Sequence, residues 1–427
     1  MNMRRMPWLL TLATLLTLLP ALSTRAHAQT RLQVEARYAQ SLRGKIDNLP
    51  VVVLRGTLAE RGQAMGALCG RDLLQTMAAI LPVFQQRPGQ GWPQLVALTQ
   101  ATFNTPEDLE QQMTAFVDGL RKSLPETQRI IEPLGRELTV ADLKTILAFP
   151  DLLGTGRIGF GGCSSFSAWG PMTPDGQVIT GRNMDYPTFP ALLPFMVVAQ
   201  APAEKDRLAT IEICIPWFGA STAMNEQGVL TLMHDENGLP PRAAAQRLPR
   251  SVVLRQAIER ANAATALNDV AEILRNKPMM MGANIHLSMP AGNDRQLPAV
   301  FEWDGNATGG GITLRQTAPN LLPDALFCTN HYLKRRAVPL GGDSVKRLNA
   351  MASLARQTRD AKQTIDVPTA QKIIAAAAVR GSLSTQLSII ALPAKRQLIV
   401  AVSPKVGSPA TDGPWVRVDW DEVFKAQ

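Results

Sequence analysis

The fold is decided by a stretch that reads Gly161-Gly162-Cys163-Ser164-Ser165-Phe166-Ser167-Ala168-Trp169-Gly170 and, after a short turn, Val178-Ile179-Thr180-Gly181-Arg182-Asn183-Met184-Asp185-Tyr186. Both halves have the alternating or apolar character of strands, and Pro174-Asp175-Gly176 between them is typical of a turn. We therefore expect an antiparallel hairpin. Such pairing brings the end that opens with Cys163 beside the end that carries Arg182 and Asp185.

Cys163 has the surroundings that a cysteine nucleophile needs. A nearby guanidinium favours the thiolate form of a thiol, so we expect Arg182 to make Cys163 more reactive. If the peptide bond between Gly162 and Cys163 is cut, the freed α-amine, with a reference pKa of about 8, can accept the thiol proton. Nucleophile and base would then be one residue. The alternative is a buried strand cysteine beside a structural Arg182–Asp185 pair.

These residues resemble the processed N-terminus of N-terminal-nucleophile hydrolases that use cysteine, and in particular the isopenicillin N acyltransferase-like (penicillin acyl-transferase) family, to which bile salt hydrolase and acid ceramidase are related. Three other motifs extend the resemblance loosely over most of the chain. They are Glu60-Arg61-Gly62-x-x-x-Gly66, Met224-Asn225-Glu226-Gln227-Gly228, in which Ala223 stands where the family usually has glycine, and Thr329-Asn330-His331-Tyr332.

The resemblance implies a fold and a set of roles. The fold is the four-layer αββα sandwich of the N-terminal-nucleophile hydrolases, in the α+β class. The implied catalytic residues are Cys163 as nucleophile, Arg182 to orient the thiolate and the substrate carbonyl, Asp185 to hold the freed α-amine, and Asn330 as oxyanion donor, with self-cleavage between Gly162 and Cys163. An Asn that ends a strand is the structural alternative for Asn330.

Four further residues are candidates for contact with substrate: Phe189, Trp217, Asn225 and His331. Phe189 lies in an apolar segment, 187–195, that could wall an acyl pocket or belong to the core. For Asn225 a turn is the better interpretation, because Asn, Glu and Gly form turns readily. His331 also permits a papain-like interpretation, in which imidazolium pairs with the Cys163 thiolate. The local sequence opposes it, because Cys163 opens a strand and not a helix.

Composition narrows the classes of partner. The chain has 427 residues, 45% of them hydrophobic, and a formal net charge of +9. Its basic residues are scattered apart from Lys334-Arg335-Arg336, and aromatic residues are few, so we expect no nucleic-acid partner. The chain has no CxxC spacing and no close pair of histidines, which gives no zinc signature, and we expect no metal and no cofactor. Whether one disulfide forms among Cys69, Cys214 and Cys328 is left open.

The start of the chain predicts export. Arg4 and Arg5 precede an apolar run over 8–22, and Ala26-His27-Ala28 is a small-x-small cleavage site. We therefore interpret 1–28 as a signal peptide, 29–162 as a mostly helical N-terminal chain of the precursor, and 163–427 as the catalytic chain. The mature protein would be periplasmic or secreted. A retained membrane anchor is disfavoured, because the run is short and no other span follows.

The periodicities place the remaining elements. A strand is expected over 50–54, and helices through Ala78 and Leu81, after Thr105 and after Thr139. Further strands are expected at 195–200, 210–215, 229–233, 284–289, 300–303, 387–392 and 398–402, and helices at 251–263, 267–276, 342–356 and 369–378.

The expected function is that of an exported, autoproteolytically activated cysteine amidohydrolase or acyltransferase that acts on a linear N-acyl amide through a thioester on Cys163. Its partners would be the small-molecule substrate and its own cleaved N-terminal chain, with the oligomeric state open. The alternatives are a papain-like cysteine peptidase and a non-catalytic secreted binding protein of the same fold. Self-cleavage separates an enzyme from a binding protein.

Overall fold

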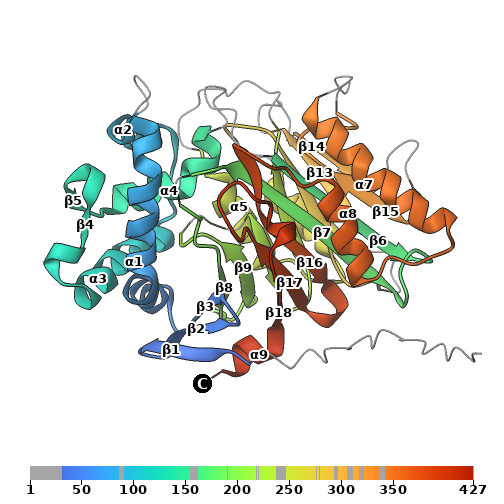
Figure 1. The fold of residues 1–427 in the computed structure, drawn as a ribbon. Coiled ribbons are helices and arrows are strands. Elements are labelled where there is room, and N and C mark those ends of the chain that lie inside the picture. The colour runs from blue at the N-terminus through green and yellow to red at the C-terminus, as the bar shows by residue number, and fades with distance from the viewer. Residues whose placement is uncertain are drawn as a thin grey trace, which may run out of the picture. The chain divides into compact units, whose positions relative to one another are not determined.

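A computed structural model describes residues 31–85, 91–153, 162–189, 191–217, 219, 221–236, 247–275, 277, 279–292, 297–304, 311–316, 322–335 and 342–426. The expected signal peptide and Gly161 lie outside the described residues. Residues 31–427 form one compact unit. Its strands lie in two large sheets, with helices on either side of them (Figure 1).

The larger sheet joins the start of the chain to its middle. In spatial order its strands are β1 (Gln33–Tyr38), β2 (Ser41–Ile46), β3 (Leu49–Leu54), β8 (Met196–Gln200), β9 (Thr210–Cys214), β10 (Thr222–Asn225), β11 (Leu230–Asp235), β12 (Ala283–Ser288), β13 (Ala299–Asp304) and β14 (Gly311–Arg315). Neighbouring strands are antiparallel except β3 and β8, which run parallel. That parallel pair connects the predicted N-terminal chain to the predicted catalytic chain within one sheet.

The smaller sheet is built on the expected hairpin. Its order is β15 (Ala325–Cys328), β6 (Gly162–Gly170), β7 (Gly176–Pro187), β16 (Leu383–Leu392), β17 (Gln397–Val402) and β18 (Trp415–Asp419), all antiparallel. In the β6–β7 register Gly162 lies opposite Asp185, Cys163 opposite Met184, and Ser165 opposite Arg182. The predicted hairpin and the meeting of its two ends are confirmed.

The helices lie in three groups. Between β3 and β6 the chain forms α1 (Leu58–Gln85), α2 (Trp92–Thr102), α3 (Glu107–Ser123) and α4 (Val140–Leu153), with a small ribbon of β4 (Ile130–Ile131) and β5 (Arg136–Glu137). Two helices follow β11, α5 (Arg250–Ile258) and α6 (Ala266–Leu274). Towards the end come α7 (Asp343–Asp360), α8 (Val367–Ala376) and the short α9 (Trp420–Lys425).

Packing of these elements produces the expected layers. Phe166, Phe327 and Ile390 of the smaller sheet pack against α7 and α8 in one buried cluster. Figure 1 shows α7 and α8 on the right, beside the smaller sheet. Ile285 and Phe301 of the larger sheet pack against α5 and α6 in another. The opposite faces of the two sheets meet through side chains of β6 and β7 and of β11 and β12. The order helix, sheet, sheet, helix is the predicted αββα sandwich.

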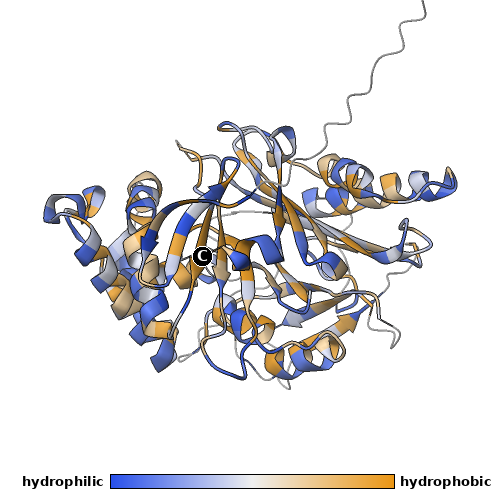
Figure 2. Ribbon diagram, turned by 90° about the horizontal axis from the view of Figure 1, so that it is seen from below, coloured by the Kyte–Doolittle hydropathy of each residue, from blue (hydrophilic) through white to orange (hydrophobic). Residues whose placement is uncertain are grey.

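The N-terminal helices pack unusually closely. A Cβ added to Gly66 of α1 would lie 1.9 Å from the carbonyl oxygen of Phe116 on α3, and one added to Gly119 would lie 1.9 Å from that of Gln63. Gly62 is equally constrained by Gln112. The glycines of the Glu60-to-Gly66 motif therefore have the structural role of letting two helix backbones touch. Figure 2 shows that the helices carry both hydrophobic and hydrophilic residues, as helices with one buried face do.

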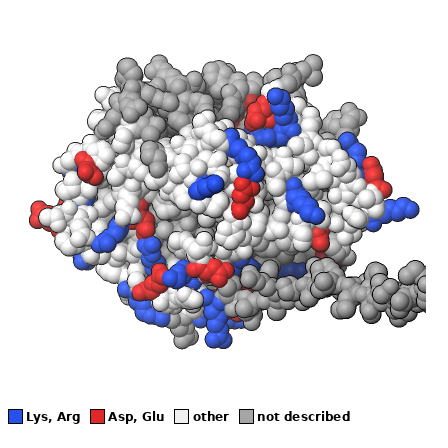
Figure 3. Space-filling model, in the orientation of Figure 1, with Lys and Arg blue, Asp and Glu red and all other residues white. Residues whose placement is uncertain are grey.

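Several expectations need correction. The N-terminal region begins with the strands β1 and β2, which were not predicted. The helices α2 and α9 and the strands β4, β5, β10, β14, β15 and β18 were not predicted either. The other predicted elements are present with ends shifted by a few residues. All four cysteines are free and buried. No described helix is long and apolar enough to cross a membrane. On the face in Figure 3, basic and acidic side chains are interspersed.

Candidate active site

Cys163 lies at the start of β6 with its side chain between the sheets, and 8% of the residue is exposed. Its backbone N–H donates to Oδ1 of Asn330 at 2.8 Å. Its carbonyl oxygen accepts from Nη1 of Arg347 at 2.6 Å. The backbone of the nucleophile is therefore fixed on both sides of its α-carbon before any cut is made.

Arg182 reaches the thiol from the neighbouring strand. Its Nη2 lies 3.5 Å from Sγ of Cys163 and donates to the carbonyl oxygen of Met233 at 2.8 Å. Its Nη1 donates to the carbonyl oxygen of Ser221. These two carbonyl oxygens, both in the larger sheet or next to it, hold the guanidinium over the sulfur, although Arg182 itself belongs to the smaller sheet.

Asp185 lies on the other side of the nucleophile's backbone. Its Oδ1 accepts from the hydroxyl of Thr385 at 2.6 Å, whereas its Oδ2 accepts no hydrogen bond from the described residues and lies 3.7 Å from Nη1 of Arg347. A Cβ built on Gly162 would lie 2.8 Å from this Oδ2 and 2.9 Å from Nη2 of Arg347. Only glycine leaves room at this position, and a carboxylate oxygen is available beside the bond expected to be cut.

Asn330 is held by hydrogen bonds at both ends of its side-chain amide. Its Nδ2 donates to the carbonyl oxygen of Asp235 at 2.7 Å, and its Oδ1 accepts from Cys163 and from Nη2 of Arg347 at 2.9 Å. Two donors at one atom and a carbonyl at the other fix the orientation of the amide. In the uncut chain Asn330 thus holds the α-nitrogen of Cys163, and its N–H group points at a backbone oxygen. Its role as oxyanion donor stays a prediction.

Burial dominates the ionisation of both key groups. It raises the pKa of the Cys163 thiol to about 11; Arg182 lowers that pKa and offsets only part of the effect, while Asp235 and Asp185 add to it. Arg182 thus acts in the expected direction, but the expectation that the thiol is more acidic than a free one is wrong for the uncut chain, because the desolvation of a buried thiolate exceeds the attraction of one cation. Burial likewise raises the pKa of Asp185 to about 6, against the effects of Arg347 and Thr385.

The four candidates for substrate contact lie in different places. Phe189 is buried in the main core. Asn225 accepts from the N–H groups of Gln227 and Val229 and donates to two carbonyl oxygens after α5, so its whole amide serves a turn. His331 Nδ1 lies 2.7 Å from the hydroxyl of Ser344, so this ring nitrogen already has a hydrogen-bond partner. Trp217 differs from the other three, because it lines a cavity.

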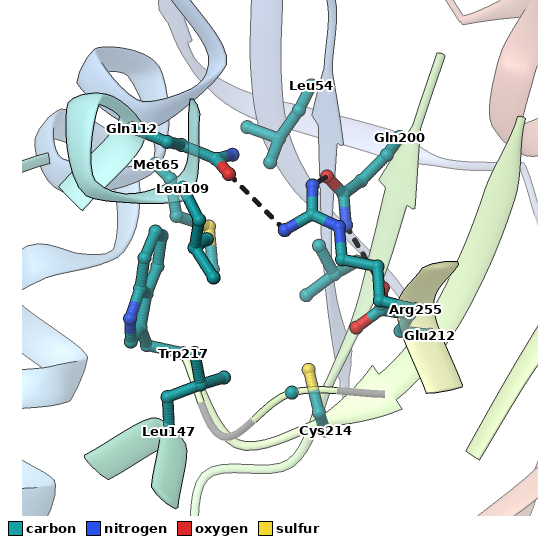
Figure 4. Close-up of a pocket in the computed structure, with 12 residues that line it drawn as sticks. Leu54, Met65, Leu109, Gln112, Leu147, Gln200, Glu212, Cys214, Trp217 and Arg255 are labelled. Carbon is teal, nitrogen blue, oxygen red and sulfur yellow. Dashed lines mark hydrogen bonds between the residues drawn. The ribbon is translucent and has the colours of Figure 1, made fainter. Parts of the chain in front are cut away.

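Two cavities are candidates for substrate binding. A small one adjoins Cys163 itself and is lined by Pro150, Gly162, Arg182, Met184, Asp185, Tyr186, Ser221, Met233 and Asp235. A larger one, of about 430 Å³ including its opening to solvent, lies between the N-terminal helices and β8 and β9. Figure 4 shows Trp217, Leu109 and Met65 on one side of the larger cavity and Arg255 with Gln200 across from them.

Three residues of the site were not found from the sequence. Arg347 on α7 contacts Cys163, Asn330 and Asp185. Asn284 on β12 donates to the carbonyl oxygens of Thr329 and His331, and so holds the chain on both sides of Asn330. Arg250, fully buried, binds Asp151 on α4 and Asp235 beside the small cavity. None of these has a local motif, because each acts across a long sequence separation.

No group of three or more His, Cys, Asp or Glu side chains within the described residues is arranged to hold a metal ion.

Comparison with known proteins agrees with the site. Residues 172–368 match the family model described as acyl-coenzyme A:6-aminopenicillanic acid acyl-transferase. The match begins just after the strand of Cys163 and includes Arg182, Asp185 and Asn330, and it confirms the family resemblance seen in the sequence. Both this match and the αββα layers agree with the fold of the N-terminal-nucleophile hydrolases.

Solved structures with weaker similarity include three enzymes. An N-acylethanolamine-hydrolyzing acid amidase ortholog of Caenorhabditis elegans is 15% identical, with 54% of this chain and 93% of that chain covered and a TM-score of 0.40. Conjugated bile acid hydrolase of Clostridium perfringens, as a mutant, is 13% identical, with coverage of 61% and 93% and a TM-score of 0.37. Penicillin V acylase of Agrobacterium tumefaciens is 12% identical, with coverage of 60% and 86% and a TM-score of 0.39. A search of the curated proteins finds no match.

Proposed function

We propose that the protein is made as an exported precursor, cuts itself between Gly162 and Cys163, and then cleaves a linear amide through a thioester on Cys163. The observation that carries this proposal is the setting of the Cys163 nitrogen. Asn330 accepts from it at 2.8 Å, and an oxygen of Asp185 that accepts no hydrogen bond from the described residues lies beside Gly162. These acceptors suit a freed ammonium even better than they suit a peptide N–H.

The cut would proceed by an N-to-S acyl shift. Sγ of Cys163 attacks the carbonyl carbon of Gly162, the C–N bond breaks, and the nitrogen takes up the thiol proton. Water then hydrolyses the resulting thioester and leaves a carboxylate on Gly162, a free thiol and a free α-amine on Cys163. The absence of a side chain on Gly162 supports this step, because a Cβ would meet Asp185 and Arg347 at under 3 Å.

After the cut, the chemistry would repeat on an external amide. The α-amine takes the thiol proton, and the sulfur attacks the substrate carbonyl. The leaving amine then takes that proton from the α-ammonium, which leaves a thioester. Arg182, whose Nη2 lies 3.5 Å from Sγ of Cys163, would stabilise the thiolate and the substrate carbonyl. Water completes hydrolysis, and a second amine in its place would give acyl transfer, which stays the alternative.

The larger cavity is the best candidate for the acyl group. Leu147 lines the larger cavity and Pro150 the small one, and both residues lie on α4. Likewise, Gly219 lines the larger cavity and Ser221, two residues later, lines the small one. Its walls are mostly apolar, which suits a hydrocarbon chain. This would give Trp217 the substrate contact that was predicted for it, whereas Phe189 and Asn225 serve the core and a turn.

Intact-mass analysis tests the proposal. The purified protein should consist of two chains, 29–162 and 163–427, and Cys163→Ala should stay as one. A panel of N-acyl amides and lactams, followed for free acid and for transferred acyl product, would then separate hydrolysis from transfer. A wild-type chain that stays uncut on prolonged incubation would remove the processing claim and favour a binding protein of the same fold.

A further inference from the structure

A chain of six buried polar side chains connects the two sheets behind the nucleophile. His234 Nε2 lies 2.8 Å from Oγ of Ser165, which lies 2.7 Å from Nδ1 of His286. Nε2 of His286 lies 2.8 Å from Oγ of Ser167, and Thr180 and Ser288 continue the chain at 2.7 Å per step. All six residues are at most 1% exposed. The mechanism above uses none of them.

The direction of every hydrogen bond in this chain follows from the tautomer of His234. Nδ1 of His234 lies 3.2 Å from the carbonyl oxygen of Leu232, which can only accept, and the backbone of Asn284 also accepts from this ring, so we assign the proton to Nδ1. A neutral His234 must then accept at Nε2 from the hydroxyl of Ser165. The oxygen of Ser165 in turn accepts from Nδ1–H of His286, and the same logic makes Ser167, Thr180 and Ser288 each donate towards His234.

Both imidazoles are neutral, as this pattern requires. Burial lowers the pKa of His234 well below its ordinary value and that of His286 to about 3, and the charge of Arg182 acts in the same direction on both. With both rings neutral and protonated at Nδ1, each contact in the chain pairs one donor with one acceptor. The chain therefore has one consistent arrangement, which favours one spacing of the two sheets.

This spacing sets the contact between Arg182 and the thiol. Ser165 lies opposite Arg182 in the β6–β7 register, and both side chains face the larger sheet. His234 follows Met233, whose carbonyl oxygen holds Nη2 of Arg182, the same nitrogen that lies 3.5 Å from Sγ. The Ser165–His234 bond therefore bridges the two sheets next to the Arg182 bridge.

We propose that Ser165, His234 and His286 are positioning residues, which hold β6 and β7 on β11 and β12 so that Arg182 stays against the sulfur of Cys163. As a refinement of the active site this rests on the proposed function, but its direct readout is the reactivity of Cys163 and needs no substrate. The proposal predicts that a break in the chain changes the thiol and not only the stability of the fold.

The test compares two neighbouring serines. Ser165→Ala removes the donor to His234 and the acceptor for His286, whereas Ser164→Ala removes a buried hydroxyl that has no hydrogen-bond partner among the described residues. Alkylation of Cys163 by iodoacetamide, followed by peptide mass spectrometry across pH, should shift upward by about one pH unit in Ser165→Ala, which is about tenfold less thiolate at a given pH. Ser164→Ala should follow the wild type.

Further measurements make the outcome decisive. Ser167→Ala breaks the chain one step further on and should give a smaller shift in the same direction, even if Ser165→Ala does not fold. Nitrogen NMR of histidine-labelled wild-type protein should show His234 and His286 protonated at Nδ1 only. An Nε2–H tautomer in either ring, or an unshifted alkylation profile in a folded Ser165→Ala, would overturn the proposal. A wild type that alkylates as expected but turns over no amide would count against the proposed function alone.

Discussion

At the scale of single residues, burial in the uncut chain disfavours both the Cys163 thiolate and the Asp185 carboxylate. A cut at Gly162 would add an ammonium on Cys163, beside the position where a Cβ built on Gly162 would lie 2.8 Å from Oδ2 of Asp185. A positive charge nearby lowers the pKa of both groups. Cleavage would therefore activate the nucleophile in two ways: it supplies a base, and its positive charge counteracts the effect of burial on both pKa values.

The pH dependence of stability tests the effect of burial on the pKa of Asp185. Asp185 has a pKa of about 6 in the folded uncut chain and would have about 3.9 when unfolded, so folding takes up a proton between these values. Its stabilising contribution is full below about pH 4 and is lost as the pH rises through 6. With about 1.4 kcal/mol per unit, the loss is about 3 kcal/mol.

This loss is best measured in an uncut background. Cys163→Ala should lose about 3 kcal/mol of unfolding free energy, from this group, between pH 4 and 7, and Cys163→Ala with Asp185→Asn should not. Urea unfolding of both variants across this range gives the difference directly. A difference between the two variants that does not vary with pH would mean that Asp185 is ionised throughout, and that burial does not control it.

The sequence could identify Cys163, Arg182 and Asp185 because their proximity depends only on the register of one hairpin. Asn330 was found by resemblance, but its orientation depends on Arg347 and Asp235, which no local pattern connects to it. The sign of the thiol shift was mispredicted for a similar reason. The charge of a neighbour can be read from a sequence, whereas the degree of burial needs both sheets.

At the scale of elements, burial and length explain why some strands were not predicted from the sequence. Residues 33–37 of β1 are all exposed, so this edge strand has no apolar alternation to detect. Several central strands, in contrast, have long buried runs and were found. The helix α2 has few buried residues, Trp92 and Thr99, and a weak periodicity. The strands β10 and β15 are fully buried, but each has only four residues. Elements that bury little or are very short leave little pattern in the sequence.

The contact between α1 and α3 supports a prediction about stability. A Cβ at Gly66 would lie 1.9 Å from the carbonyl oxygen of Phe116, and backbone on both sides leaves no flexible atom to yield. Gly66→Ala should therefore force the helices apart and lower the free energy of unfolding by about 3 kcal/mol. Denaturant unfolding of the Cys163→Ala background measures this without interference from cleavage.

Gly91→Ala is the matched control for this effect. Gly91 precedes α2 with a φ of −61°, and an added Cβ would meet only the end of the Gln94 side chain, at 2.8 Å. That side chain can turn away, so the change should stay under about 1 kcal/mol. Equal losses in the two variants would show that helix spacing is not what Gly66 sets.

At the scale of the whole unit, the main core is shared between the two predicted chains. It combines Val52, Met113 and Phe116 from before the cut with Val197, Ile213 and Leu387 from after it. The parallel pairing of β3 with β8 and the buried Arg250–Asp151 ion pair join the same two parts. Neither chain could bury these surfaces alone, so the cleaved chains should stay together.

Cleavage should then change how unfolding depends on concentration. In the uncut Cys163→Ala variant the two parts are covalently joined, so its urea midpoint should not vary with protein concentration. In the cleaved protein unfolding releases two chains, and mass action raises the midpoint as concentration rises; a hundredfold increase contributes about 2.7 kcal/mol. Measurement from about 0.1 to 10 μM, with refolding checked at each concentration, would show this difference. A midpoint that is constant in a protein shown by mass to be fully cut would mean that one chain keeps its fold without the other, contrary to the shared core.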